Sequence, residues 1–130
     1  MARTVAVALV CGAVATAACA PTEPVAEGPV TYEGGMATLL ADDLLQVMVE
    51  MGGPVTRDDL RVYADCAAAD AAVFKGLSFA RHVRTTVYEE AGLARADAVY
   101  TVSTTLPAGM KTIDAAWQAE TCRELGIPRV

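Results

Sequence analysis

The segment Arg81-His82-Val83-Arg84 carries the side chains best suited to bind an anion. His82 is the one histidine of the chain, and guanidinium groups stand on both sides of it. Alternate residues of a strand share a face, so we expect His82 and Arg84 to point together, away from the packed helix. The pair would then bind a carboxylate or phosphate group of a small ligand. The alternative is a solvated strand face on which Arg84 pairs with a nearby carboxylate.

Other residues that could do chemistry do not form a catalytic pattern. Asp65 and Asp70 are five positions apart, which places them on different faces of a helix. Ser78 and Ser103 lack the GxSxG context of serine hydrolases, and the sequence has no glycine-rich loop typical of phosphate binding. We therefore expect a protein that is not an enzyme and that uses no cofactor.

The four cysteines divide into two that lie near the start of the chain and two that lie far downstream. Cys66 and Cys122 are the downstream pair, and a disulfide between them closes a loop of about 57 residues, worth about 4 kcal/mol in the chain-entropy model. Metal binding is the alternative, but the chain has no CxxC motif, and one histidine is too few for a zinc cage. The sequence predicts a disulfide between these two cysteines and no metal site.

Residues 1–18 have the order of a secretory signal peptide. Arg3 precedes an apolar run from Val5 to Ala18, and small residues follow around Cys19. The run is too short and too rich in alanine for a membrane span. Export would place the rest of the chain outside the cytosol, where a disulfide can form.

Two ways of processing this leader stay open. Thr16-Ala17-Ala18-Cys19 resembles the lipobox of bacterial lipoproteins, although Thr16 stands where that family usually carries Leu, Val or Ile. The other route is cleavage after Ala18-Cys19-Ala20, which would leave Pro21 beside the cut. We favour lipidation of Cys19, so that the protein contacts the membrane only through a lipid anchor. In either case the expected location is the periplasm, anchored or soluble.

The composition limits the domains and the partners that we expect. Residues 19–35 are rich in proline, glycine and glutamate, which predicts a flexible tether, and residues 36–130 are enough for a single domain. After loss of Arg3, nine basic residues stand against sixteen acidic ones. An acidic domain without a basic stripe is a poor partner for nucleic acid, so we expect no nucleic-acid binding.

The folded part begins with an ambiguous segment and a clear helix. Residues 44–51 fit both helical and strand spacing, and we favour a strand because Gly52, Gly53 and Pro54 follow it. Thr56 and Asp59 then form a capping box. The helix that follows has an apolar face and ends near Gly76; the face comprises Leu60, Tyr63, Ala64, Ala67, Ala71 and Phe74.

Strand patterns follow the helix. Segments near residues 77–87, 94–103 and 110–119 alternate in the manner of strands, and turn residues lie between them. Residues 120–125 also permit a short helix. We expect an α+β fold of two layers, in which one main helix packs on a three- to four-stranded antiparallel sheet. Trp117 and the methionines Met36, Met48 and Met51 are expected to fill the core.

The stretch from Tyr63 to Cys122 also resembles a family of small uncharacterised envelope proteins and lipoproteins of alphaproteobacteria. The resemblance rests on the segments FARHVRT, ADAVYTVS and KTIDA, and it includes both downstream cysteines. It covers a little under half the chain. Because the family has no assigned activity, the resemblance implies a location in the cell envelope and no catalytic residue.

We therefore expect a non-enzymatic envelope protein that presents a surface to another protein or to a cell-wall component. An exposed sheet edge or apolar patch is typical of such a protein. The alternative is a small periplasmic binding module for an anionic ligand. That module would have a pocket containing His82, Arg84 and Tyr88.

Overall fold

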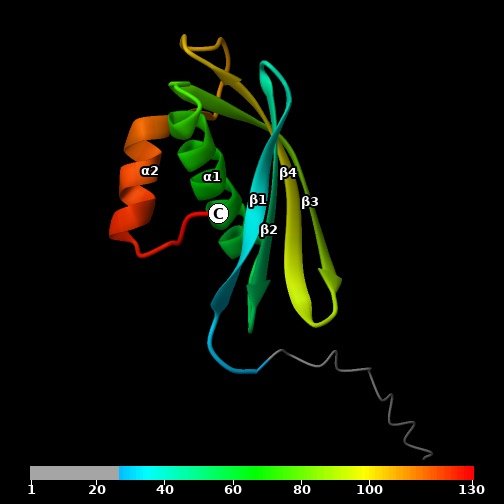
Figure 1. The fold of residues 1–130 in the computed structure, drawn as a ribbon. Helices are drawn as coiled ribbons and strands as arrows, with labels where there is room; N and C mark the ends of the chain where they lie inside the picture. The colour runs from blue at the N-terminus through cyan, green and yellow to red at the C-terminus, as the bar shows by residue number, and fades with distance from the viewer. Residues whose placement is uncertain (1–26) are drawn as a thin grey trace, which may run out of the picture.

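A computed structural model describes residues 27–130, in which a curled antiparallel sheet lies beside two helices (Figure 1). The strand order across the sheet is β1-β2-β4-β3-β5. The strands are β1 (Thr31–Ala41), β2 (Leu44–Gly52), β3 (Phe79–Glu90), β4 (Leu93–Ser103) and β5 (Thr112–Asp114). The α+β class and the antiparallel sheet are confirmed, whereas the sheet has five strands, one or two more than the sequence suggested. The predicted signal peptide (1–18) and the predicted lipidation site Cys19 lie outside the described residues.

Strand β2 shows how alternation builds the core. Leu45, Val47, Val49 and Met51 are buried, while the residues between them are half-exposed. The preference for a strand over a helix at this segment is therefore confirmed. Strand β4, which pairs with β2, buries a matching set on the same face: Ala96, Ala98, Tyr100 and Val102.

Helix α1 (Arg57–Phe74) covers this apolar face of the sheet. Its buried residues include five alanines, and four of these share one continuous core with alanines of β3 and β4. Small side chains on both sides let the helix backbone lie close to the sheet. The capping box is confirmed, since the Thr56 hydroxyl accepts from the Asp59 backbone N–H at 3.1 Å, and the Asp59 carboxylate accepts from the Thr56 backbone N–H at 2.8 Å.

A second helix, α2 (Ala115–Glu124), packs against α1 (Figure 1). The sequence prediction assigned most of this segment to a strand, with only a short helix allowed at its end. Strand β5 in fact stops at Asp114, whose side chain accepts from the Trp117 backbone N–H at 3.0 Å and begins the helix. Figure 1 shows α1 between α2 and the sheet. The predicted two-layer fold therefore has a second helix, α2, on the side of α1 that faces away from the sheet.

The predicted tether, residues 19–35, extends into the folded part of the chain. Strand β1 begins at Thr31, so five residues assigned to the tether belong to the sheet. The reason is packing: the Tyr32 ring meets the buried Tyr63 ring edge to face, with 4.8 Å between the centroids. Residues 27–30 are exposed and irregular, as a tether would be.

Three predicted core residues are exposed. Trp117 is 66% exposed because it lies on the first turn of α2, where the inward positions are taken by Ala115 and Ala119. Phe74 is 86% exposed because the buried line of α1 ends at Ala72. Met36 is 58% exposed because it lies on the outer face of β1, opposite the half-exposed Met48. Among the expected core methionines, Met51 is fully buried.

Candidate functional site

A β-bulge in β3 determines which face of the sheet each predicted anion-binding residue lies on. His82 pairs with Tyr100 and Arg84 pairs with Val99, so Val83 is an extra residue between two consecutive pairs. The strand alternation is thereby broken, and His82 and Arg84 lie on opposite faces of the sheet. The prediction that they point together is wrong, because it assumed an unbroken strand.

Arg84 lies on the outer face, away from the helices. It donates a 3.3 Å hydrogen bond to the Thr86 hydroxyl, two residues along the same strand. Nearby on this face, Arg95 forms ion pairs with Glu50 at 3.2 Å and Glu90 at 3.0 Å. Arg95 is therefore matched by two carboxylates, whereas Arg84 forms no ion pair in the described residues and does not line a pocket with His82.

His82 instead points toward α1 and is half-buried. Its Nε2 lies 2.6 Å from the Thr85 hydroxyl, and its ring meets the Tyr100 ring edge to face at 5.5 Å between centroids. Since Tyr100 is fully buried, this stacking gives the imidazole a fixed wall on one side. Nδ1 has no hydrogen-bond partner within residues 27–130.

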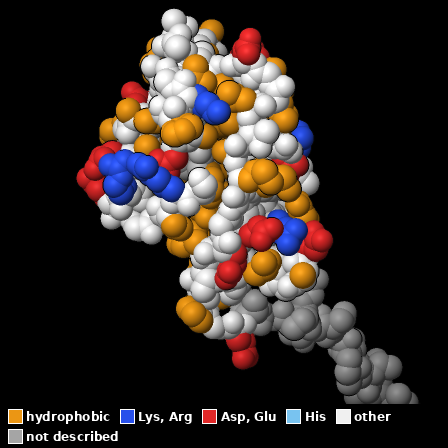
Figure 2. Space-filling view, viewed as in Figure 1, with side chains coloured by type: hydrophobic (Ala, Val, Ile, Leu, Met, Phe, Trp, Pro, Cys, Tyr) orange, Lys and Arg blue, Asp and Glu red, His pale blue; other side chains and the backbone are white. Residues whose placement is uncertain are grey.

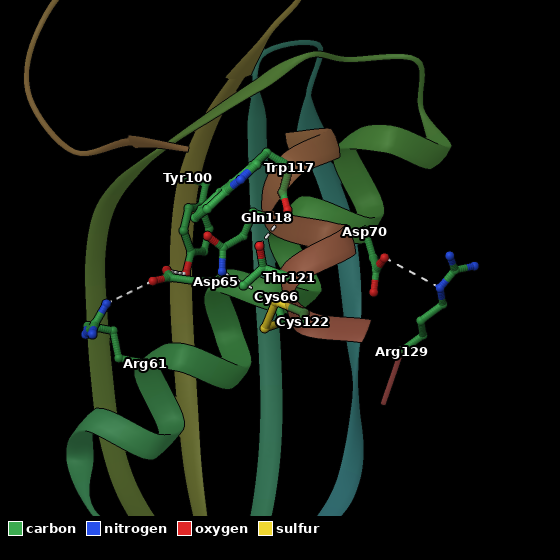
Figure 3. The surroundings of a disulfide bond; sticks show 10 residues. All are labelled: Arg61, Asp65, Cys66, Asp70, Tyr100, Trp117, Gln118, Thr121, Cys122 and Arg129. Carbon is green, nitrogen blue, oxygen red and sulfur yellow. Dashed lines mark hydrogen bonds and ion pairs between the residues drawn. A yellow bond between two sulfur atoms is a disulfide. The ribbon is translucent and has the colours of Figure 1, made fainter. Parts of the chain in front are cut away.

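A chain of polar groups connects this wall to α1 (Figure 3). The Tyr100 hydroxyl donates to Asp65 Oδ1 at 2.7 Å, and Arg61 Nη1 donates to Asp65 Oδ2 at 3.0 Å. Arg61 also pairs with Asp58 at 2.9 Å. Burial, reinforced by the Asp65 charge, raises the pKa of Tyr100, so its hydroxyl stays protonated and acts as a donor.

These residues border a groove between α1 and β3. Its two adjoining parts have volumes of about 450 and 380 Å³, and Arg61 and His82 line both. The other lining residues of the first part are Asp65, Lys111, Thr112 and Ile113, and those of the second are Arg57, Asp58, Thr85 and Val87. Volumes of this size are typical of small-ligand sites.

One wall of the groove has an unsatisfied polar atom. Thr112 Oγ1 is buried and has no hydrogen-bond partner within residues 27–130. Lys111, the residue before it, has a positive φ of 62°, a conformation uncommon for residues other than glycine. Such strain is often found at binding sites. Arg57, Arg61 and Lys111 were not singled out from the sequence, because only the packing of α1 against β3 and β5 brings them to His82.

The predicted disulfide between Cys66 and Cys122 is present (Figure 3). It joins α1 to α2, and both cysteines are buried. Gln118 Nε2 lies 3.4 Å from the Cys122 sulfur. Asp65 and Asp70 point to different sides of α1, as expected: Asp65 contacts Tyr100, and Asp70 pairs with Arg129 at 3.5 Å.

Two further findings concern residues 27–130. Within this part of the chain, no three His, Cys, Asp or Glu side chains come together as a metal site. Neither helix described there is long and apolar enough to cross a membrane. Figure 2 shows positive and negative side chains beside one another on the visible face, without an extended basic surface.

The fold and the disulfide define a small α+β domain in which α1 covers one face of the sheet and α2 packs on α1. Residues 32–126 match the YNQ4 C-terminal domain family, so the chain belongs to that family. It is also similar to an uncharacterised 26.9 kDa protein encoded in the nqo8 5′ region of Paracoccus denitrificans, with 32% identity over 106 residues. The alignment covers 77% of this chain and 42% of that protein, so the chain spans less than half the length of this relative. No solved structure gives a significant match.

The family match confirms the coarse part of the expected resemblance. The chain belongs to an uncharacterised bacterial family, and an alphaproteobacterial origin is consistent with the Paracoccus relative. The matched residues run from the start of β1 to the end of α2, which is the whole of the described fold apart from its termini.

Proposed function

We propose that the chain is an exported protein of the bacterial cell envelope, lipid-anchored at Cys19, that works by binding a protein or a cell-wall component. The observation that carries this proposal is the buried disulfide between Cys66 and Cys122. Reducing systems of the cytosol keep thiols reduced, whereas the periplasm allows disulfides to form and persist. A disulfide that links the only two helices of the described fold suits a domain that folds after export.

The N-terminal sequence supports the same location. Arg3 and the apolar run that ends at Ala18 follow the order of a signal peptide, and Cys19 stands at the lipidation position of a lipobox. Because β1 begins at Thr31, the stretch from Pro21 to Val30 is the remaining spacer. Ten residues span at most about 35 Å when fully extended. That length allows the domain to clear the lipid headgroups.

Binding, as opposed to catalysis, agrees with the surfaces of the domain. The outer sheet face is broad, and Arg95 on this face pairs with two glutamates. Strand β1 lies at one edge of the sheet and contains a single charged residue, Glu33. An edge strand with so little charge presents free backbone groups to which a partner can add a strand.

A reporter fusion tests the proposal. The full chain is fused to alkaline phosphatase, which is active only after export, and membrane and soluble periplasmic fractions are separated. We expect activity in the membrane fraction. The Cys19→Ala variant should stay exported but move to the soluble fraction, while deletion of residues 2–18 should abolish activity. An inactive full-length fusion in the cytosol would overturn export, and an unchanged membrane fraction for Cys19→Ala would overturn the anchor.

A further inference from the structure

We propose that the groove between α1 and β3 binds a small organic anion, with Arg57 and Lys111 supplying the charge and His82 a hydrogen bond. The ligand class is a carboxylate or phosphate carried on a partly apolar body. This inference goes beyond the proposed location, because it concerns the purified domain and does not depend on export or on the lipid anchor.

The distribution of positive charge favours an anion at this groove. Residues 27–130 contain nine Lys and Arg side chains, and four of these form ion pairs in that part of the chain. Arg57 and Lys111 are not among the four, yet both line the groove. Lys111 lines the first part of the groove and Arg57 the second, so each part has a cation without a carboxylate partner. In a strongly acidic protein such local positive charge favours an anion.

The negative groups of the groove are already engaged. Asp65 accepts from Tyr100 at 2.7 Å and from Arg61 at 3.0 Å, and Asp58 accepts from Arg61 at 2.9 Å. Arg61 is therefore held in place by the carboxylates and balances one of their two negative charges. With Arg57 and Lys111 counted, three cations face two carboxylates, so the groove carries a net charge of +1. The groups left to meet a ligand are Arg57, Lys111 and His82.

His82 is positioned to take part in recognition. The Thr85 hydroxyl engages Nε2 at 2.6 Å, and stacking on Tyr100 fixes the ring plane. Nδ1 has no partner within the described residues, so it is available to a ligand. Thr112, which lines the same groove, has a buried hydroxyl oxygen with no hydrogen-bond partner in the described residues.

The remaining walls explain why the ligand has an apolar part. Ile113 lines one half of the groove and Val87 the other, and both also pack against the hydrophobic core. An inorganic ion would leave these side chains exposed to water. An anion with a hydrocarbon or sugar body would cover them and gain from burial of apolar area.

NMR titration tests this inference, because His82 is the one histidine and gives a single set of imidazole signals. Two probes separate the sources of the anion: N-acetylmuramic acid carries a sugar carboxylate, and glycerol 3-phosphate carries a lipid-type phosphate. N-acetylglucosamine and glycerol are their uncharged counterparts. We expect a saturable shift of the His82 signals with at least one anion and none with its uncharged counterpart.

Variants locate the site. Arg57→Gln and Lys111→Gln should each weaken binding about five- to tenfold, as expected for loss of one charge-assisted contact. Lys75→Gln is the matched control, since Lys75 caps the opposite end of the 18-residue helix, about 27 Å from its first turn. Arg84→Gln, on the outer face, should also leave binding unchanged.

Three results would overturn the inference. The first is no shift with either anion at tens of millimolar in a protein with a native amide spectrum. The second is an equal shift with the uncharged probes. The third is full-strength binding in Lys111→Gln and Arg57→Gln. None of these results would bear on export, which the fusion experiment tests separately.

Discussion

At the residue scale, the capping box of α1 makes the most local prediction. Thr56→Ala removes the hydroxyl that accepts from the Asp59 backbone N–H. We expect a loss of about 1 kcal/mol in the free energy of unfolding, the usual effect of removing an N-cap. Urea denaturation at neutral pH measures it, with Thr104→Ala as the control because that threonine is exposed and lies in a loop.

The same box sets a pH dependence. Hydrogen bonds from the Thr56 backbone and hydroxyl lower the pKa of Asp59 below its ordinary value of 3.8. A carboxyl whose pKa is lowered by folding stabilises the folded state at pH values above its pKa in the unfolded chain. That stabilisation is lost as the pH falls through the pKa of the folded state. The difference between wild type and Thr56→Ala should therefore shrink below about pH 4. A constant difference down to pH 2 would contradict this assignment.

Tyr100 provides a second test at this scale. Tyr100→Phe removes the hydroxyl that donates to Asp65 at 2.7 Å and leaves the ring in place. Because the acceptor is a carboxylate, we expect a loss of roughly 1.5–3 kcal/mol in unfolding free energy. Tyr88→Phe, on the partly exposed outer face, should change it by less than about 0.5 kcal/mol. Equal effects of the two substitutions would contradict the described role of the Tyr100 hydroxyl.

The residues of the groove show what sequence reasoning can and cannot reach. Thr56 and Asp59 were found because a capping box is a local pattern, four residues long. The direction of His82 was missed because the extra residue Val83 shifts the register with β4. Nothing local to the segment FARHVRT marks the bulge. Arg57, Arg61 and Lys111 meet His82 only through tertiary packing.

At the scale of elements, the close approach of β1 and β2 depends on Gly35. A Cβ added at Gly35 would lie 2.1 Å from the Met48 carbonyl oxygen, too close for any side chain. Gly35→Ala should therefore push the strands apart and destabilise the domain by roughly 1–3 kcal/mol. Thr38→Ala, on the same strand but exposed, should cost less than about 0.5 kcal/mol. Urea denaturation compares the two variants. Equal stability would contradict the need for glycine at position 35.

The disulfide is the second test among elements, because it fastens α2 to α1. With a sequence separation of 56 between its cysteines, the crosslink should stabilise the domain by about 4 kcal/mol. We expect the double variant Cys66→Ala/Cys122→Ala to lose most of that amount in urea denaturation. Adding reductant should destabilise the wild type and leave the double variant unchanged. Equal stability of wild type and double variant would contradict a structural role for the bond.

The elements differ in how well the sequence predicts them. Strands β2 and β4 and helix α1 were predicted because each has a regular apolar period over nine or more residues. Strand β1 was hidden by its glycines and by the proline-rich stretch before it. Helix α2 was assigned largely to a strand because Ile113, Ala115, Trp117 and Ala119 alternate. Asp114 as an N-cap was the local signal that favoured a helix.

At the scale of the whole molecule, the formal net charge of −6 disfavours binding to nucleic acid. The chain belongs to a family defined as a C-terminal domain, and the match covers 42% of the Paracoccus relative. The domain is thus found joined to a further segment in that relative.

Whole-molecule predictions depend on processing of the N-terminus, which the described residues do not include. Export, anchoring and crosslinking make one prediction about covalent structure: residues 1–18 are removed, Cys19 carries lipid, and Cys66 is joined to Cys122. Each change alters the mass of the chain by a distinct amount. A single spectrum can therefore report all of them together.

Intact-mass analysis of the protein purified from its native cells tests the account most directly. The account predicts a chain that begins at Cys19, bears a diacylglyceryl group, and is lighter by two hydrogen atoms than its chemically reduced form. A full-length chain that retains its first eighteen residues, with Cys66 and Cys122 both open to alkylation, would contradict it.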